Sequence, residues 1–551
     1  MEAELLPGRG TGGAKSGPSS RGRGAIAYDG VEWRRDSAAL ASETNMATAF
    51  NWYPSDRRTS LPRTPAMPAL RALLTQGGDM RIGLDGATGR NAYGCGGIPD
   101  PDLAAFGSST ASTISVGGYR AAGALRDRVV DGGPVRIEQE AARIRQALLD
   151  LNRVPRDAGV EAVLAASGTD AHLIFATLQL NRPGKPWLIV MPDPCETGSG
   201  VPDAIAGRHF NSGTALGAAS RKGSAISNAE PGRTLHYALR NRDGSIRTTD
   251  SIDEEVDAAI RAGLADGNRI LLVAVDGSKT GLVAPSPMRS TDWKARFGDS
   301  IEVLVDACQF RLSTVRLNHY LAGDCAVAVT GSKFMGGPIY SGALLLPAGA
   351  AARTREAAFP AGLSAYSARC DWPSHWAAAG RLEATANLGL LLRWEAALAE
   401  LGRFRAIADE RAAEIALRFR DLLIPALEAT DMLDPLPPAC CDEADAAITA
   451  PLDRVPTIFS FRLKRRGGAA GCRSAEEARH IYRTMPVLDC LPWIGPRTEI
   501  GQPVSVGEAG ALRLSLSAPL LAGADEDGGA ALGRLIGQVV DRIDRTARAI
   551  D

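Results

Sequence analysis

The chain has 551 residues, of which 45% are hydrophobic and 23% are charged, and its formal net charge is −1. That length allows several domains with a substantial core, and the composition is ordinary for a soluble globular protein. Balanced charge gives no sign of a nucleic-acid or membrane-surface partner, and the apolar runs are far shorter than the roughly 20 residues of a membrane span. Nine scattered cysteines without a CxxC pair argue against disulfides or a metal site, so we expect a cytoplasmic protein that holds no metal.

Residues 1–66 are rich in Gly, Ser, Arg and Pro and show no sustained hydrophobic period. Such a segment cannot offset its chain entropy by burial, so the sequence predicts a disordered leader. Its basic start is also compatible with an organelle transit segment, although Glu2 and Glu4 weaken that interpretation, and the apolar stretch of a secretory signal is missing.

Residues 131–346 alternate between helix-like stretches and short apolar runs. The expected helices are Arg136–Asn152, Ala171–Leu180 and Ile252–Leu264, and the expected strands are Val160–Ala165, Trp187–Met191, Ile270–Val275, Ile301–Val305, Ala326–Val329 and Ala343–Leu346. This rhythm predicts a large α/β domain with a mostly parallel central sheet and helices on both faces.

The remaining segments flank this domain. Residues 347–551 predict a smaller C-terminal α+β domain, with helices at Leu382–Leu401 and Phe404–Leu423 and strands at Thr457–Leu463 and Ala511–Leu516. We expect residues 67–130 to contribute to the small domain and to the active-site entrance, which the Ser/Thr-rich segment Ser108–Ser115 would line.

Polar residues follow four of the expected strands, where ligands collect in open α/β sheets. The first group, Ser167-Gly168-Thr169-Asp170, precedes a helix and combines small residues with hydroxyls, as a phosphate site requires. The same four residues are also an ordinary helix N-cap, which is the more frequent meaning of such a segment.

The other three strand ends carry an acid, a lysine and a polar turn. Asp306 ends a hydrophobic strand and precedes Gln309, so its carboxylate needs a cationic or N–H partner, although an N-cap is equally compatible. Lys333 follows Thr330 and Ser332 between two apolar strands, and burial would lower its pKa as a Schiff-base amine requires. The polar turn around Ser278 would line one side of a site for a planar ligand.

This ordered set resembles the fold-type I pyridoxal-phosphate (PLP) enzymes, and within them the class V aminotransferases and cysteine-desulfurase-like proteins. The matching motifs are Asp306-Ala307-Cys308-Gln309, Ser332-Lys333 and the segment Arg381–Asn387, which is similar to the Glu-x-Gly-Thr-x-Asn segment of that family. The resemblance covers roughly residues 80–520.

The resemblance implies a role for each matched residue. Lys333 would hold PLP as a Schiff base and then shuttle the Cα proton of the substrate, while Asp306 would pair with the pyridine nitrogen. Gln309 and Ser278 would contact the phenolic oxygen, and Arg513 would bind the substrate carboxylate. The phosphate would be held by Ser167, Gly168, Thr169, Thr330 and Ser332, together with Thr385 of the other subunit of a homodimer.

The sequence departs from the family at the ring stacker. Thr197, after Glu196, occupies the position where the family places an aromatic residue or His, and His172 and Phe310 are weak substitutes. Losing that His weakens the desulfurase interpretation. A desulfurase also needs a reactive cysteine, for which Cys490 and Cys370 lie in suitable loops, although most isolated cysteines are packing residues.

The sequence therefore predicts a PLP-dependent aminotransferase acting on an amino acid or related amine. Two alternatives stay open: a lyase of cysteine-desulfurase or β-elimination type, and a non-catalytic PLP-binding regulatory protein. The intact pair of Lys333 and Asp306 argues against the second.

Overall fold

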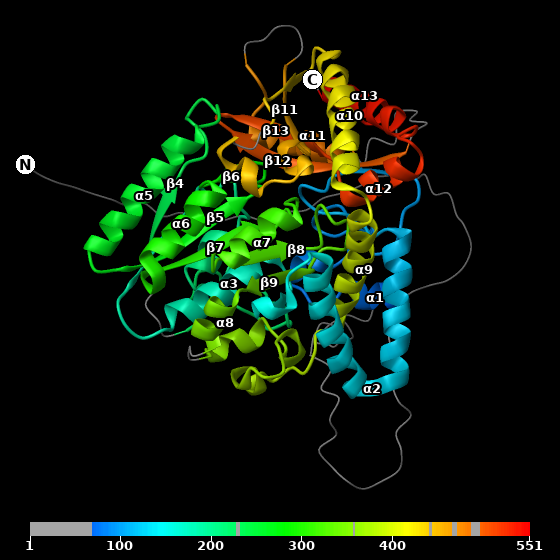
Figure 1. The fold of residues 1–551 in the computed structure, drawn as a ribbon. Coiled ribbons are helices and arrows are strands. Elements are labelled where there is room, and N and C mark those ends of the chain that lie inside the picture. Colours follow the sequence, from blue (N-terminus) through cyan, green and yellow to red (C-terminus); the bar gives the residue numbers. More distant parts are fainter. Residues whose placement is uncertain are drawn as a thin grey trace, which may run out of the picture. The chain divides into compact units, whose positions relative to one another are not determined.

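The computed structural model describes residues 69–227, 232–355, 359–439, 443–465, 471–485 and 496–550 (Figure 1). The predicted leader and Cys490 lie outside these ranges. Within them, no helix combines the length and the apolar character that crossing a membrane would take.

The larger of two sheets has eight strands, and its path runs β2-β9-β8-β7-β5-β3-β4, with β6 paired to β5. Its strands are β2 (Glu161–Ala165), β3 (Trp187–Pro192), β4 (Arg233–Tyr237), β5 (Arg269–Asp276), β6 (Val283–Ala284), β7 (Ile301–Ala307), β8 (Ala326–Thr330) and β9 (Gly342–Leu346). β4, β3, β5, β7 and β8 run parallel to one another, whereas β9 runs antiparallel to both β8 and β2, and β6 runs antiparallel to β5. The predicted mostly parallel central sheet is thus confirmed.

Alternation of side chains along the strands explains why both faces of this sheet are covered. In β5, Ile270 and Leu272 belong to the core on one face, while Leu271 and Val273 belong to the core on the other. The first face packs against α2 (Val116–Leu151), α5 (Thr249–Ala265), α6 (Pro287–Phe297) and α7 (Thr314–Ala322). The second packs against α3 (Gly168–Leu180), α4 (Val201–Ile205) and α8 (Ala348–Arg355).

The smaller sheet has five strands in the order β1-β12-β13-β11-β10. They are β1 (Leu103–Phe106), β10 (Leu433–Pro435), β11 (Ile458–Leu463), β12 (Arg497–Val506) and β13 (Ala509–Ser515). β1 pairs in parallel with β12, so a strand from the N-terminal part of the chain completes a sheet that is otherwise C-terminal and antiparallel. The C-terminal helices are α9 (Leu388–Arg405), α10 (Asp409–Glu428), α11 (Ala475–Thr484), α12 (Ala518–Glu526) and α13 (Leu532–Ala549).

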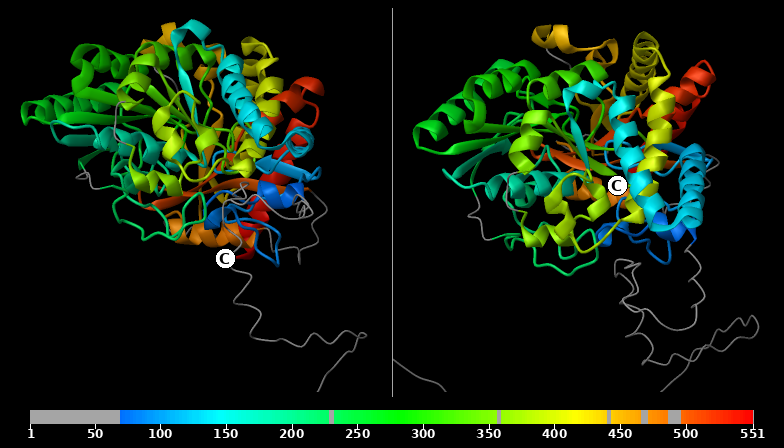
Figure 2. Two further views of the ribbon diagram at one scale, coloured as in Figure 1. Left: turned by 90° about the horizontal axis from the view of Figure 1, so that it is seen from below. Right: turned by 60° about the horizontal axis from the view of Figure 1, so that its bottom comes forward.

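Three helices differ by five residues or more from their predicted extents. α10 lies at Asp409–Glu428 rather than Phe404–Leu423. α2 begins at Val116 and crosses the expected segment boundary between residues 130 and 131, but Gly133 (φ 64°) and Pro134 kink it close to that boundary. Its two halves are joined by the Arg128–Glu140 ion pair (2.8 Å), and it packs along α9 (Figure 1 and Figure 2). α9 begins six residues later than the predicted Leu382, because the Asn387 side chain caps it by accepting from the backbone N–H of Leu390.

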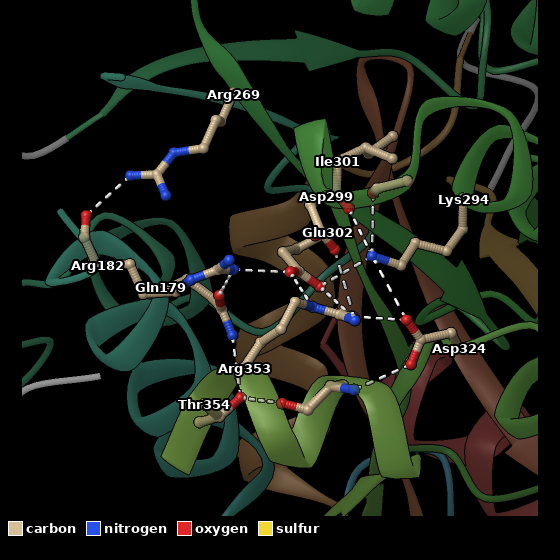
Figure 3. A network of polar contacts seen from close by, with 12 residues as sticks. Gln179, Arg182, Arg269, Lys294, Asp299, Ile301, Glu302, Asp324, Arg353 and Thr354 are labelled. Carbon is tan, nitrogen blue, oxygen red and sulfur yellow. Dashed lines mark hydrogen bonds and ion pairs between the residues drawn. The ribbon is translucent and has the colours of Figure 1, made fainter. Parts of the chain in front are cut away.

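A buried acid, Glu302, holds the amino end of β7 (Figure 3). Its carboxylate accepts from Arg182 of the segment after α3 (2.7 Å), from Arg353 of α8 (2.7 Å) and from Lys294 of α6 (3.4 Å). Burial alone would raise the pKa of Glu302. The hydrogen bonds from Arg353 and the charges of the neighbouring cations outweigh this effect, so the pKa of Glu302 is lowered. Helices from both faces of the sheet are therefore tied to the strand whose opposite end carries Asp306.

Candidate active site

The chain path of the large sheet marks one place for a ligand. β3 and β5 are parallel neighbours, yet the chain continues from β3 to β4 on one side and from β5 toward β7 on the other. Ligands of open α/β sheets bind at such a switch point, outside the carboxyl ends of the strands. The loops there are residues 193–200 and 277–282, and the polar strand ends at Ser167, Asp306 and Lys333 lie on the same edge of the sheet.

Lys333 lies in the glycine-rich turn after β8. Its amine makes no hydrogen bond or ion pair with any of the residues that the structure describes, while its carbonyl accepts from the Ser112 hydroxyl (2.9 Å). Burial lowers the pKa of Lys333; Arg513 and Arg311 add to this effect, and Cys308 and Asp306 oppose it. The result is an amine that gives up its proton more readily than a surface lysine.

Asp306, near the end of β7, lies beside His172 of α3. The Oδ2 atom of Asp306 is 3.5 Å from Nε2 of His172, and its Oδ1 accepts from the backbone N–H of Cys308 (3.1 Å). His172 is fully buried; its Nδ1 contacts the Gly168 carbonyl (2.7 Å), and its Nε2 has no hydrogen bond. The Cys308 N–H thus holds the carboxylate, and Nε2 of His172 lies beside it without a hydrogen bond to the described residues.

The same three side chains form a potential metal-ligand group. The ligand atoms of His172, Asp306 and Cys308 all lie within 4.8 Å of one another. However, burial and the adjacent Asp306 raise the pKa of the Cys308 thiol well above its ordinary value. The thiol is therefore largely protonated near neutral pH when no metal is bound.

The predicted phosphate loop opens α3. Ser167 caps the helix by accepting from the Asp170 N–H (3.3 Å), and its own hydroxyl donates to the Asp170 carboxylate. Gly168 is tightly enclosed: a Cβ atom there would lie 2.3 Å from Sγ of Cys308. The Thr169 hydroxyl makes no hydrogen bond to the described residues, and neither does the hydroxyl of Ser332.

Two other predicted phosphate contacts are used differently. The Thr330 hydroxyl donates to the Cys308 carbonyl (2.7 Å), so its proton is engaged within the chain. Thr385 lies before α9, where its carbonyl accepts from the Cys370 N–H (2.9 Å). Its contact with the cofactor of a partner subunit stays a prediction.

Glu196 joins the two switch-point loops. It is almost completely buried and accepts from Ser278 (2.7 Å), Thr280 (3.0 Å) and Arg240 (2.8 Å). We expected the Ser278 hydroxyl to contact the phenolic oxygen of a cofactor. In the structure it donates its hydrogen bond to Glu196 instead. Thr197 is also buried, but its hydroxyl oxygen has no hydrogen-bond partner among the described residues, so an unsatisfied polar atom remains where the ring stacker was expected.

The segment Ser108–Ser115 packs against several predicted site residues. The Gln309 side chain donates to the Ser109 carbonyl (2.9 Å), and Arg311 donates to the Ser108 hydroxyl (2.9 Å). Arg311 was not predicted, because a strand-end arginine has no distinctive sequence signal. Its guanidinium also donates to the Leu516 carbonyl, and burial with the nearby Arg513 lowers the pKa of Arg311 to about 9.

Arg513 of β13 reaches the same edge, but its donors are occupied. Nε and Nη2 donate to the Gln502 carbonyl, Nη2 also to Thr110 Oγ1, and Nη1 to the carbonyls of Lys279 and Ser109, at 2.7 to 3.4 Å. A guanidinium has five N–H donors, so none is left over. A substrate carboxylate would have to displace one of these bonds, and the predicted role of Arg513 stays a prediction. Burial lowers its pKa to about 10.

Lys279 is a second lysine at this edge that the sequence did not mark as a site residue. Its Nζ donates to the Pro194 carbonyl (3.2 Å). Burial, and then repulsion from Arg513, lower the pKa of Lys279 to about 8.

The remaining candidates lie in packed surroundings. Phe310 is fully buried in the core with α2, α5 and α7, whereas Asp306 projects toward α3 on the other face. Burial raises the pKa of the Cys370 thiol to about 12, so its reactive thiolate is scarce near neutral pH.

Comparison with known proteins gives only distant likenesses. No family model matches the chain, and no curated protein matches it. Among solved structures, Oryza sativa TDC with PLP and tryptamine is 16% identical, with a TM-score of 0.47 over 82% of this chain and 84% of that one. Rhodiola rosea 4-hydroxyphenylacetaldehyde synthase is 14% identical, with a TM-score of 0.48 over 82% and 83%.

A third solved structure is the glutamate decarboxylase domain of a diaminobutyrate-pyruvate transaminase and L-2,4-diaminobutyrate decarboxylase from Vibrio parahaemolyticus. It is 12% identical, with a TM-score of 0.48 over 82% of this chain and 81% of that one. Likenesses of this strength carry no weight for the function of this chain.

Proposed function

We propose that this chain is a fold-type I PLP-dependent enzyme that transfers the amino group of an amino acid or related amine, with Lys333 as the residue that holds the cofactor. The observation that carries the proposal is the Lys333 amine itself. It lies at the ligand-binding edge of the sheet, its pKa is lowered, and it has no partner among the described residues. Burying a charged ammonium group without an ion-pair partner is unfavourable, so the neutral amine is favoured. The neutral amine is the form that reacts as a nucleophile.

The residues at this edge fit PLP. Asp306 would accept from the ring nitrogen, and its position is fixed by His172 and the Cys308 N–H. The N-terminal turn of α3, with the free Thr169 hydroxyl, and the Ser332 hydroxyl would hold the phosphate. The unsatisfied Thr197 hydroxyl is a further polar atom available to the group. In a homodimer, Thr385 of the partner subunit would complete the phosphate site.

When bound, PLP supplies an electron-withdrawing ring that stabilises negative charge on the substrate carbon next to the nitrogen. The chain's own groups do the rest. The Asp306 carboxylate would keep a proton on the ring nitrogen of PLP, because a buried carboxylate strongly favours an N–H partner. With PLP bound, the Lys333 amine would take up the Cα proton of the substrate and pass it on, for which a lowered pKa is suited.

The first test is the absorption spectrum after addition of PLP. We expect the wild-type protein to develop a visible band that Lys333→Met abolishes, while Lys185→Arg, at an exposed lysine, leaves it unchanged. A band that persists in Lys333→Met would refute the proposed role of Lys333.

The reaction class follows from the products. Addition of amino acids to the loaded protein should convert the cofactor to its amine form if the enzyme transfers amino groups. Release of sulfide, pyruvate or carbon dioxide without that conversion would instead identify a lyase. A loaded protein that responds to no amine would be a PLP-binding protein without turnover.

A further inference from the structure

Positive charge gathers at the ligand-binding edge. Four cationic side chains meet there: Lys279, Arg311, Lys333 and Arg513, and burial lowers the pKa of each. Two carboxylates lie among them, of which Glu196 is already paired with Arg240 and Asp306 lies beside His172. Since unpaired buried charge is unfavourable, such a site is completed by an anion.

Counting hydrogen-bond donors shows which cation is free to bind that anion. The five N–H groups of Arg513 are all taken by the chain, and four of the five in Arg311 are. The Lys333 amine is committed to the cofactor under the proposed function. Lys279, by contrast, uses one of its three donors, on the Pro194 carbonyl, and has two left over.

The backbone holds Lys279 in place at the switch point. Its N–H donates to the Glu196 carbonyl (3.0 Å), and its carbonyl accepts from Arg513 (2.8 Å). The residue is thus fixed between the loop after β3 and strand β13, while its amine makes one hydrogen bond to the part of the chain that the structure describes. The backbone of Lys279 is therefore held rigidly, while its side-chain amine can still turn toward a ligand.

We propose that Lys279 binds the carboxylate of the substrate, which makes the substrate an amino acid rather than a simple amine. This inference rests on the proposed function for the identity of the reaction. The ammonium group of Lys279 would form a charge-assisted hydrogen bond to the carboxylate. Arg513 could take this role only by giving up one of its hydrogen bonds within the chain. The groups that face Lys279 are Arg513, Glu196, Cys195 and Lys333.

Calorimetric titration with succinate tests the proposal on the PLP-loaded protein. Succinate should bind to the wild type and to Lys279→Arg, and Lys279→Met should weaken it roughly tenfold or more, the value of one charge-assisted hydrogen bond. Succinamide, the uncharged isostere, should not bind. Equal affinity of the wild type and Lys279→Met for succinate would overturn the proposal.

A second measurement needs no variant. Brief acetylation followed by peptide mapping should show that succinate, but not succinamide at equal ionic strength, protects Lys279, while the exposed Lys185 reacts equally in both. Unchanged labelling of Lys279 would overturn the proposal. Failure of the PLP-dependent function shows separately, as a protein that forms no cofactor band. The acetylation experiment is repeated on the protein without PLP, where protection of Lys279 by succinate would still measure binding of the carboxylate.

Discussion

At the scale of single residues, the site depends on close contacts between groups from different strands. Gly168 is the clearest case, because its Cα faces Cys308 so closely that any side chain would collide with the sulfur. Sequence reasoning identified Gly168 and the order of Asp306, Gln309 and Lys333 along the chain. It did not identify the Glu196 contacts or the free donors of Lys279, because these depend on loops far apart in sequence meeting in space.

Replacing Gly168 by Ala should destabilise the protein by about 1–3 kcal/mol, the usual cost of overpacking, since the new methyl group would lie 2.3 Å from Sγ of Cys308. Urea unfolding of the cofactor-free protein measures this. Adding Cys308→Ala to the same chain should recover part of the loss by removing the sulfur. A double variant less stable than the sum of the single changes would contradict this account of the contact.

Asp371 should make stability depend on pH. Burial raises the pKa of Asp371 to about 7, against the opposing effect of the Ala368 N–H, so the folded protein binds a proton that the unfolded chain has released. Its contribution to stability is therefore greatest below about pH 4, the pKa of an unperturbed Asp, and falls as the pH rises toward 7. In Asp371→Asn this fall should be absent, so the difference in stability between variant and wild type should change between about pH 4 and 7. Parallel pH profiles would show that the acid does not titrate as described.

At the scale of elements, hydrophobic patterning predicted six of the eight strands of the large sheet, because buried parallel strands are short continuous apolar runs. Helix ends were less predictable. The apolar pattern beginning at Leu382 hides the cap at Asn387, whose side chain also binds the Gly77 carbonyl, a contact across more than 300 residues. The sequence also missed β1, β4, β6, β10 and β12, and the pairing of β1 with β12 is visible only in space.

The amino end of β7 gives an element-scale prediction. Glu302→Gln should lower the free energy of unfolding by about 3–5 kcal/mol, because it leaves Arg182, Arg353 and Lys294 without their buried acid. Urea unfolding is the measurement. Glu255→Gln, which removes an exposed ion pair with Arg247, is the control and should cost less than about 1 kcal/mol. Similar losses in the two variants would contradict the importance of burial.

At the scale of the whole molecule, the predicted architecture of a large, mostly parallel sheet with a smaller C-terminal α+β part agrees with the two sheets observed. The topology then explains why the chemistry gathers where it does. Strands β2, β5, β7 and β8 end at the same edge, and segment Ser108–Ser115 and β13 close on it from outside the large sheet. The order of the strands along the sequence predicted that the candidate groups lie near one another. Which hydrogen-bond donors of Arg513 and Lys279 are occupied could be seen only in the three-dimensional structure.

The most direct measurement is the identity of the lysine that becomes bonded to PLP. Borohydride reduction of the loaded protein, followed by peptide mapping, should place the pyridoxyl group on Lys333 in nearly every chain that carries it. Pyridoxyl label on Lys279, or a protein that takes up no PLP at all, would contradict the account.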